Sequence, residues 1–343
     1  MKDLTDYCVD ILEELLLIPS PTGYANMAID FVKKEFEKLD IPTKLTYKGA
    51  LIATIEGNSR DALTFSGHVD TLGMMVKEIK PDGRLSFHRI GSYPFNTVEG
   101  EYVIVKTIDG REFTGTVTLN NSSVHVHPDE IAKGERSADT MSIKLDELVN
   151  SEEDTRKLGI EIGDFIFIDT RTVITESGFI KSRHLDDKAG VACILSLAKY
   201  LKDNDIKPEM TIHFLISNYE EVGHGACFIP ENTKDFIAVD MAAPDTGQAS
   251  KEILVTICAM DSSGPYDIDI RNKLIQIAKS KDIDYAVDIY PFYMSDGSAA
   301  LRSGNDIKVG LIGPGVSNSH TFERTHRLGL ENTIRLMIEY IKS

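Results

Sequence analysis

Two adjacent glutamates, Glu220 and Glu221, directly follow an apolar run over 211–217 that has the character of a strand, and glycines come soon after. Neighbouring carboxylates repel each other unless a cation lies beside them. A metal ion meets this need, because one carboxylate can ligate it while the other handles protons. The alternative is two solvated glutamates in the first turn of a helix, where the positive helix end favours them.

Four further candidate ligands stand where predicted strands end or predicted helices begin: His68, Asp186, Asp240 and His320. Ligands of open α/β sheets bind at the carboxyl ends of the strands, so these groups and Glu221 could converge on one edge. Two imidazoles and three carboxylates suit a pair of zinc, cobalt or manganese ions. Such a pair needs a bridging carboxylate and can share one water as the nucleophile.

Each candidate also has a structural interpretation. A single histidine after a strand, such as His68, is more often structural, although Asp70 is near enough in sequence to receive its second ring N–H. Asp186 could be a carboxylate at a helix start, Asp240 a polar strand end and His320 a loop histidine. No single member decides the matter, but the order of the whole set at element edges favours a metal site.

The other histidines receive structural interpretations, with one open case. His224 lies three residues after Glu221 and could face the same pocket. The remaining histidines are interpreted as structural or surface residues, including a pair inside the middle segment of the chain: His88, His125, His127, His184, His213 and His326.

Helices and strands alternate in the outer parts of the chain. Apolar spacing predicts helices over 3–18, 24–39, 188–202, 265–279, 296–303 and 330–342. Strands are expected over 43–47, 50–56, 62–67, 210–217, 235–240, 253–258, 285–289 and 307–312. This alternation predicts an α/β fold with a mixed, mostly parallel sheet flanked by helices.

Between about 72 and 173 the pattern changes to short alternating segments with turn signals, interrupted by one expected helix near 151–158. Asp109-Gly110 between two β-rich runs is a strong hairpin signal. We therefore expect a small, β-rich, barrel-like domain over 72–173, inserted into a discontinuous catalytic domain over 1–71 and 174–343.

Composition limits the partners. The 343 residues include 54 acidic and 37 basic side chains, for a net charge of −17, which argues against nucleic acid or an anionic membrane as the main partner. No apolar run reaches the length of a membrane span, and no secretory signal pattern is seen. The four cysteines are widely spaced and predict buried thiols in a reducing compartment. We therefore expect a cytoplasmic protein.

The arrangement resembles the glutamyl aminopeptidase / tetrahedral aminopeptidase family of co-catalytic metallopeptidases, some members of which are labelled deblocking aminopeptidases or endoglucanases. The matching stretches span the whole chain: Ser66-Gly67-His68-Val69-Asp70, His184-Leu185-Asp186-Asp187-Lys188, Asn218-Tyr219-Glu220-Glu221-Val222-Gly223, Ala238-Val239-Asp240 and Asn318-Ser319-His320. The long gap between the first His and the next Asp, which holds the β-rich insertion, looks like the tetrahedral aminopeptidases.

The resemblance implies a zinc-peptidase-like fold and a ligand set for two divalent ions. His68 and Asp240 would bind one ion, Glu221 and His320 the other, and Asp186 would bridge them. Zinc is the first choice, with cobalt or manganese as alternatives.

The resemblance also implies roles beyond the ligands. Glu220 would be the general base and Asp70 would orient His68, while the Asp186–Asp187 peptide would be cis. The insertion would serve oligomerisation and substrate access, in a hollow homo-dodecamer acting on short peptides. Three departures concern substrate preference: Thr71 where the family often has Glu, His224 where it often has an aliphatic residue, and a shorter run after His320.

The function expected from these residues is a metal-dependent aminopeptidase, in which Glu220 takes the proton of an activated water and delivers it to the leaving amine. Two alternatives stay open. One is hydrolysis of another amide or of a glycoside, which would need two unligated carboxylates beside the scissile bond. The other is a non-catalytic metal-binding or peptide-binding protein on the same scaffold, for which loss of Glu220 or a ligand would be expected. The role of Asp296, in a stretch that the resemblance places near the pocket, is open.

Overall fold

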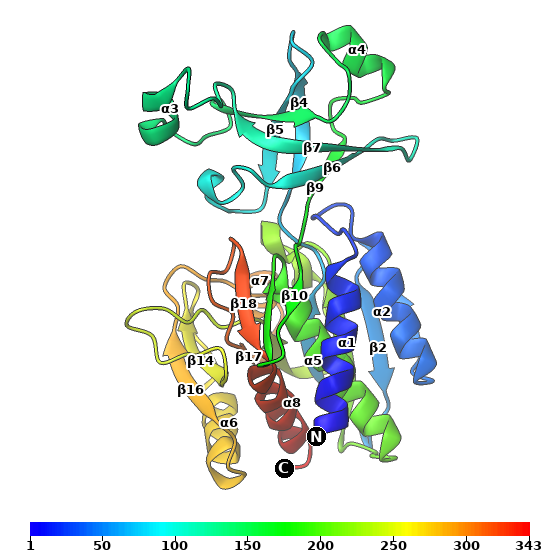
Figure 1. The fold of residues 1–343 in the computed structure, drawn as a ribbon. Coiled ribbons are helices and arrows are strands. Elements are labelled where there is room, and N and C mark those ends of the chain that lie inside the picture. Colours follow the sequence, from blue (N-terminus) through cyan, green and yellow to red (C-terminus); the bar gives the residue numbers. More distant parts are fainter. The chain divides into compact units, whose positions relative to one another are not determined.

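The computed structural model describes all residues from Met1 to Ser343 and divides into two compact units. One unit contains Met1–Thr71 and Arg171–Ser343, and the other contains Leu72–Thr170 (Figure 1). No helix in the structure is both long and apolar enough to cross a membrane.

The first unit is built on a nine-stranded sheet in the order β1-β2-β12-β3-β13-β17-β14-β15, with β16 paired to β14. Its strands are β1 (Thr43–Leu45), β2 (Leu51–Ile55), β3 (Ser59–His68), β12 (Met210–Ser217), β13 (Thr233–Val239), β14 (Val255–Asp261), β15 (Gly264–Pro265), β16 (Tyr285–Ile289) and β17 (Lys308–Pro314). The central strands β12, β3, β13 and β17 run parallel, so their carboxyl ends share one edge.

The sheet is covered on both faces, which explains why its central strands are almost continuously apolar. Phe214 of β12 packs into the core formed with helices α1 (Lys2–Leu16), α2 (Asn26–Lys38), α5 (Leu185–Asp203), α6 (Ile268–Ser280) and α8 (Arg327–Ile341). The next residue, Leu215, joins the opposite core with Ala300 of helix α7 (Asp296–Arg302). The predicted mixed, mostly parallel α/β fold is therefore confirmed.

A small second sheet, β10-β11-β18, was not predicted. Its strands are β10 (Val173–Ile174), β11 (Phe179–Ser182) and β18 (Glu323–His326). Their short length, between polar and glycine-rich turns, leaves little periodicity to read in the sequence. The β11–β18 pairing matters for function, because β11 leads into the start of α5 and β18 follows His320.

The starts of helices α6 and α8 differ from the sequence prediction, and in both cases a side-chain cap marks where the helix begins. Helix α6 begins at Ile268, since the Asp267 carboxylate accepts hydrogen bonds from the backbone N–H groups of Asp269 and Ile270. Helix α8 begins at Arg327, because Nδ1 of His326 accepts the N–H of Leu328. This capping role also confirms the structural interpretation of His326.

The second unit contains a closed antiparallel barrel in the order β4-β5-β8-β7-β6-β9. Its elements are β4 (Gly73–Ile79), β5 (Leu85–Ile90), β6 (Tyr102–Lys106), β7 (Glu112–Leu119), β8 (Met141–Leu145) and β9 (Phe165–Ile168), with short helices η1 (Phe95–Thr97), α3 (Pro128–Lys133) and α4 (Glu152–Lys157). The β6–β7 hairpin turns at Asp109-Gly110 as expected, and Gly110 has a positive φ of 88°. Alternate strand residues such as Val103 and Val105 fill the barrel core.

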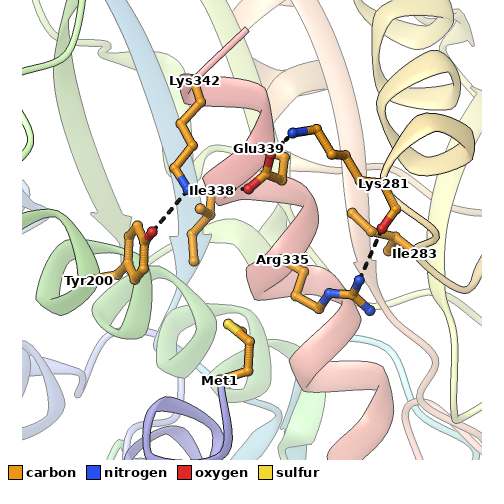
Figure 2. A pocket seen from close by; sticks show the side chains of 8 residues that line it. All are labelled: Met1, Tyr200, Lys281, Ile283, Arg335, Ile338, Glu339 and Lys342. Atoms are coloured by element: carbon orange, nitrogen blue, oxygen red, sulfur yellow. Dashed lines mark hydrogen bonds and ion pairs between the residues drawn. The ribbon is translucent and has the colours of Figure 1, made fainter. Parts of the chain in front are cut away.

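A cavity of about 170 Å³ lies at the carboxyl-terminal end of α8 (Figure 2). Its cationic side chains already have partners: Glu339 pairs with Lys281 at 2.7 Å and with Lys342 at 3.2 Å, and Arg335 donates to the backbone carbonyl of Lys281. Basic side chains at a helix carboxyl end favour the negative end of the helix dipole. This cluster therefore ties α8 to its neighbours.

Candidate active site

The candidate ligands converge at the carboxyl edge of the parallel strands. His68 ends β3, and Asp240 directly follows β13, the neighbour of β3. Their ligand atoms and those of Asp186 all lie within 4.8 Å of one another. This trio is almost completely buried, so ionised carboxylates in it need a cation for compensation.

A second trio shares Asp186 with the first. Asp186, Glu221 and His320 also place their ligand atoms within 4.8 Å of one another. The two oxygens of Asp186 face different histidines: Oδ1 lies 3.3 Å from Nε2 of His68, and Oδ2 lies 3.3 Å from Nε2 of His320. One carboxylate placed between two histidines is the arrangement that a bridging ligand requires.

The local sequence explains how Asp186 reaches this position. His184 caps α5 in the left-handed region at φ 68°, and Asp186 and Asp187 keep non-helical dihedral angles before the regular helix starts. The Asp186–Asp187 peptide is cis, as expected from the resemblance. Beyond it, α5 is buried along nearly its whole length, so its first turn is fixed against the sheet.

His68 provides a test of whether these residues fit a metal. Its Nδ1 lies 2.9 Å from the backbone carbonyl oxygen of Asp70, which can only accept a hydrogen bond, so Nδ1 carries the proton. Nε2 is buried without a hydrogen-bond partner and lies 3.3 Å from Oδ1 of Asp186. A buried unpaired nitrogen aimed at carboxylates fits a metal ligand, since it would otherwise be a costly orphan.

The electrostatics of the site agree with this fit. Burial, together with the Asp186 charge, raises the pKa of Asp240 to about 7 and also raises the pKa of Glu221. Burial and the neighbouring carboxylates raise the pKa of Glu220. Asp186 behaves differently: burial opposes ionisation, but the two histidines hold its pKa below the usual range. So many crowded carboxyl groups ionise together only when cations lie among them.

Comparison with known proteins identifies the family. A family model described as M42 glutamyl aminopeptidase matches residues 49–336. The chain belongs to this M42 family. It is 48% identical over 338 residues, covering 98% of this chain and 97% of its relative, to the Bacillus subtilis (strain 168) protein named "Putative aminopeptidase YhfE".

Solved structures agree on the fold. The dodecamer of PhTET1-12s has a TM-score of 0.86 at 22% identity and covers 97% of this chain and 98% of that chain. The Pyrococcus horikoshii TET1 peptidase, which can assemble into a tetrahedron or a large octahedral shell, has a TM-score of 0.83 at 22% identity, with 97% and 99% covered. The expected family is confirmed, and this M42 protein is a hydrolase of the metalloaminopeptidase type.

In this M42 site, Glu220 stands beside the ligands without belonging to either trio. Its Oε2 lies 3.6 Å from Nε2 of His68. The Asp70 carboxylate accepts the backbone N–H groups of Glu220 and Glu221 at 3.1 and 3.3 Å, and the hydroxyl of Thr22 at 2.6 Å. Asp70 thus positions the two glutamates with its side chain. Nδ1 of His68 lies 2.9 Å from the backbone carbonyl oxygen of Asp70 and 3.5 Å from its carboxylate Oδ1.

Several histidines and cations lie outside the metal-binding groups. His224 is exposed, stacks on Tyr219 with ring centroids 4.9 Å apart, and has its Nδ1 3.2 Å from Nζ of Lys48. His125 and His127 are exposed on the inserted unit and belong to neither trio. Lys308 lies at the amino end of β17, the end of that strand away from the site, and pairs with Asp269.

Two buried carboxylates near the site had no assigned role in the sequence. Asp296 accepts hydrogen bonds from the hydroxyls of Ser66 (2.8 Å) and Ser217 (2.6 Å) and from the backbone N–H of Ala226 (2.9 Å). It therefore joins the ends of β3 and β12, which carry the ligands. The other is Glu323, at the start of β18. The partners of Asp296 are all far away along the chain, and Glu323 joins the nearby His320 to the distant Asp186, so neither role could be predicted from local sequence.

Proposed function

We propose that this M42 protein is an aminopeptidase that removes N-terminal residues from short peptides with the help of two divalent metal ions. His68 and Asp240 would hold one ion, Glu221 and His320 the other, and Asp186 both. The observation that carries the proposal is the pair of adjacent candidate ligand groups that share Asp186, with Nε2 of His68 buried beside that carboxylate and without a hydrogen-bond partner.

Two ions at these groups would lower the pKa of a shared water and polarise the substrate carbonyl. Glu220 is the proposed general base. Asp70 fixes its backbone, and its carboxylate faces the same space as Nε2 of His68. Glu220 accepts the proton of the attacking water and then delivers it to the leaving amine. Zinc is the proposed metal, with cobalt and manganese compatible with the same donor set.

The exposures of the two trios support an entry side for substrate. His68 and Asp240 are buried, whereas the side chain of His320 is 35% exposed. A free α-amino group arriving from solvent would therefore meet the Glu221–His320 side or a neighbouring carboxylate. That contact would restrict cleavage to the first peptide bond, which is the defining property of an aminopeptidase.

We also propose that the unit over Leu72–Thr170 mediates self-association into a dodecamer, on the model of the PhTET1-12s dodecamer. Light scattering coupled to size-exclusion chromatography tests this point. A mass near twelve chains is expected, and a monomer at micromolar concentration would contradict the assembly without affecting the chemistry.

The proposed reaction is tested with a panel of aminoacyl-p-nitroanilides. The protein is stripped with chelator and then given zinc, cobalt or manganese. Metal-restored hydrolysis of free-amine substrates, together with no hydrolysis of the N-acetylated forms, is the expected result. Correctly assembled protein that binds two ions but cleaves none of these substrates would instead favour a binding protein, or a hydrolase of blocked peptides or other amides.

A further inference from the structure

Glu323 connects the two backbone segments that carry Asp186 and His320. Its Oε2 accepts the backbone N–H of Asp186 at 3.1 Å, and its Oε1 accepts the backbone N–H of His320 at 3.0 Å. The side chain is 1% exposed. Both oxygens are engaged by backbone donors, and Glu323 belongs to neither of the two candidate metal-binding groups.

The fold places Glu323 at this junction through the small second sheet. Glu323 opens β18 and pairs with Ser182 at the end of β11. After Ser182 the chain passes through His184 to Asp186. His320 comes just before Glu323. The strand pairing brings the two segments alongside each other, but it ends before either ligand. Glu323 is the contact that extends the connection to the ligands themselves.

Both connected segments adopt backbone conformations that need support. His184 has φ 68° and His320 has φ 62°, and residues with a Cβ rarely occupy this left-handed region unless surrounding contacts hold them there. A buried carboxylate that accepts two N–H groups is a strong local constraint. It links the backbone of Asp186 to the backbone of His320.

Other ligands in the site are held in a similar way by carboxylates outside the two trios. Asp70 accepts the backbone N–H groups of Glu220 and Glu221, and Asp187 accepts that of His68 at 3.2 Å. Glu323 differs because its two donors belong to ligands from separate parts of the chain. One of these ligands is the residue shared by both trios.

We infer that Glu323 is a positioning residue that pre-organises the Asp186–Glu221–His320 group for its metal ion. This inference rests on the proposed function. It predicts the effect of replacing the Glu323 carboxylate by a side chain that lacks its charge and its two equivalent oxygens. The ion in the Asp186–Glu221–His320 group should then bind more weakly, and this loss should exceed that of the ion held by His68 and Asp240. A glutamine can accept one of the two N–H groups, but its amide NH₂ would face the other.

The test uses Glu323→Gln in the full chain, with Glu339→Gln as a matched control. Glu339 also pairs with two groups, at the end of α8 away from the site. Zinc binding is measured by competition with a chromophoric chelator, and bound metal by mass spectrometry. The second ion of Glu323→Gln should bind about 10- to 100-fold more weakly, the usual effect of losing a contact that orients a ligand. The first ion should stay bound, and kcat should recover at high zinc with KM unchanged.

A measurement on the metal-free wild type covers the case in which Glu323→Gln does not fold. Hydrogen exchange should show protected amides at Asp186 and His320, because protein contacts rather than metal hold them. Free exchange at both amides would overturn the inference, and so would equal two-ion affinity in Glu323→Gln and wild type. A wild type that fails to bind two ions would instead overturn the proposed function, so the two failures are distinguishable.

Discussion

Replacing Glu220 by glutamine should abolish most turnover while leaving both metals bound. Glu220 lies outside both ligand trios. Its backbone is fixed by the Asp70 carboxylate at 3.1 Å, so an isosteric side chain should not move the turn. What changes is the capacity of the side chain to accept a proton, because an amide is not a base at neutral pH.

The expected size of the effect follows from the role. A positioned general base contributes about 10²- to 10⁴-fold to the rate. At about 1.36 kcal/mol for each tenfold change, this corresponds to about 2.7–5.4 kcal/mol of transition-state stabilisation. Burial and neighbouring carboxylates raise the pKa of Glu220 in the metal-free protein.

The assay compares kcat and KM for a p-nitroanilide that the wild type cleaves, at matched zinc content. Glu220→Gln should lower kcat within that range with KM nearly unchanged, and metal analysis should still find two ions. Glu221→Gln serves as the contrast, because it removes a ligand oxygen and should bind the second ion more weakly. A Glu220→Gln protein with kcat near that of wild type would refute Glu220 as the base.

Three further predictions concern the surroundings of the site. Asp296→Asn should lower the free energy of unfolding by about 1–3 kcal/mol in urea titrations, because an amide side chain cannot accept from all three donors that contact Asp296. An unchanged unfolding midpoint would contradict this role. Gly225→Ala should lower the free energy of unfolding by about 1–3 kcal/mol, because a Cβ there would lie 2.2 Å from Oδ1 of Asp296. An unchanged thermal midpoint would argue against this close contact. Metal-free protein should lose stability between about pH 4 and 7, because burial raises the folded-state pKa of Asp240 to about 7 and also raises the pKa of Glu221. The contribution of these two groups is full below their unfolded pKa and is lost as pH rises through their folded pKa. His184, whose pKa burial lowers, opposes the two carboxyl groups in the same range. Burial lowers the pKa of Lys188 to about 7, so this group opposes the loss of stability only above that pH. Scanning calorimetry with and without zinc should show the largest stabilisation by zinc near pH 7.

The sequence was sufficient for the parts of the fold that follow from periodicity. The apolar runs ending at His68 and Ser217 and just before Asp240 are strands buried on both faces, and strands of this type are recognisable without knowledge of their neighbours. Because they run parallel, their ends had to meet at one edge, which is why widely separated ligand candidates could be grouped in advance.

The parts that were not predicted depend on long-range contacts. The sheet β10-β11-β18 consists of strands too short for a periodic signal, and Glu323 gains its role only through that pairing. The capped starts of α6 and α8 depend on individual side-chain rotamers. Likewise, the hydrogen bond of His68 to the carbonyl of Asp70 depends on the local path of the chain, which the spacing of two residues does not determine.

The most direct test of the account is a crystal structure of the zinc-loaded protein with anomalous data collected at the zinc edge. The account predicts two anomalous peaks, one contacted by His68 and Asp240, the other by Glu221 and His320, and both by Asp186. Co-catalytic ions in two-metal sites lie about 3.5–4 Å apart, so the peaks should be resolved at that spacing. A single peak, or two peaks that share no contact with Asp186, would contradict the two-metal site on which the proposed function depends.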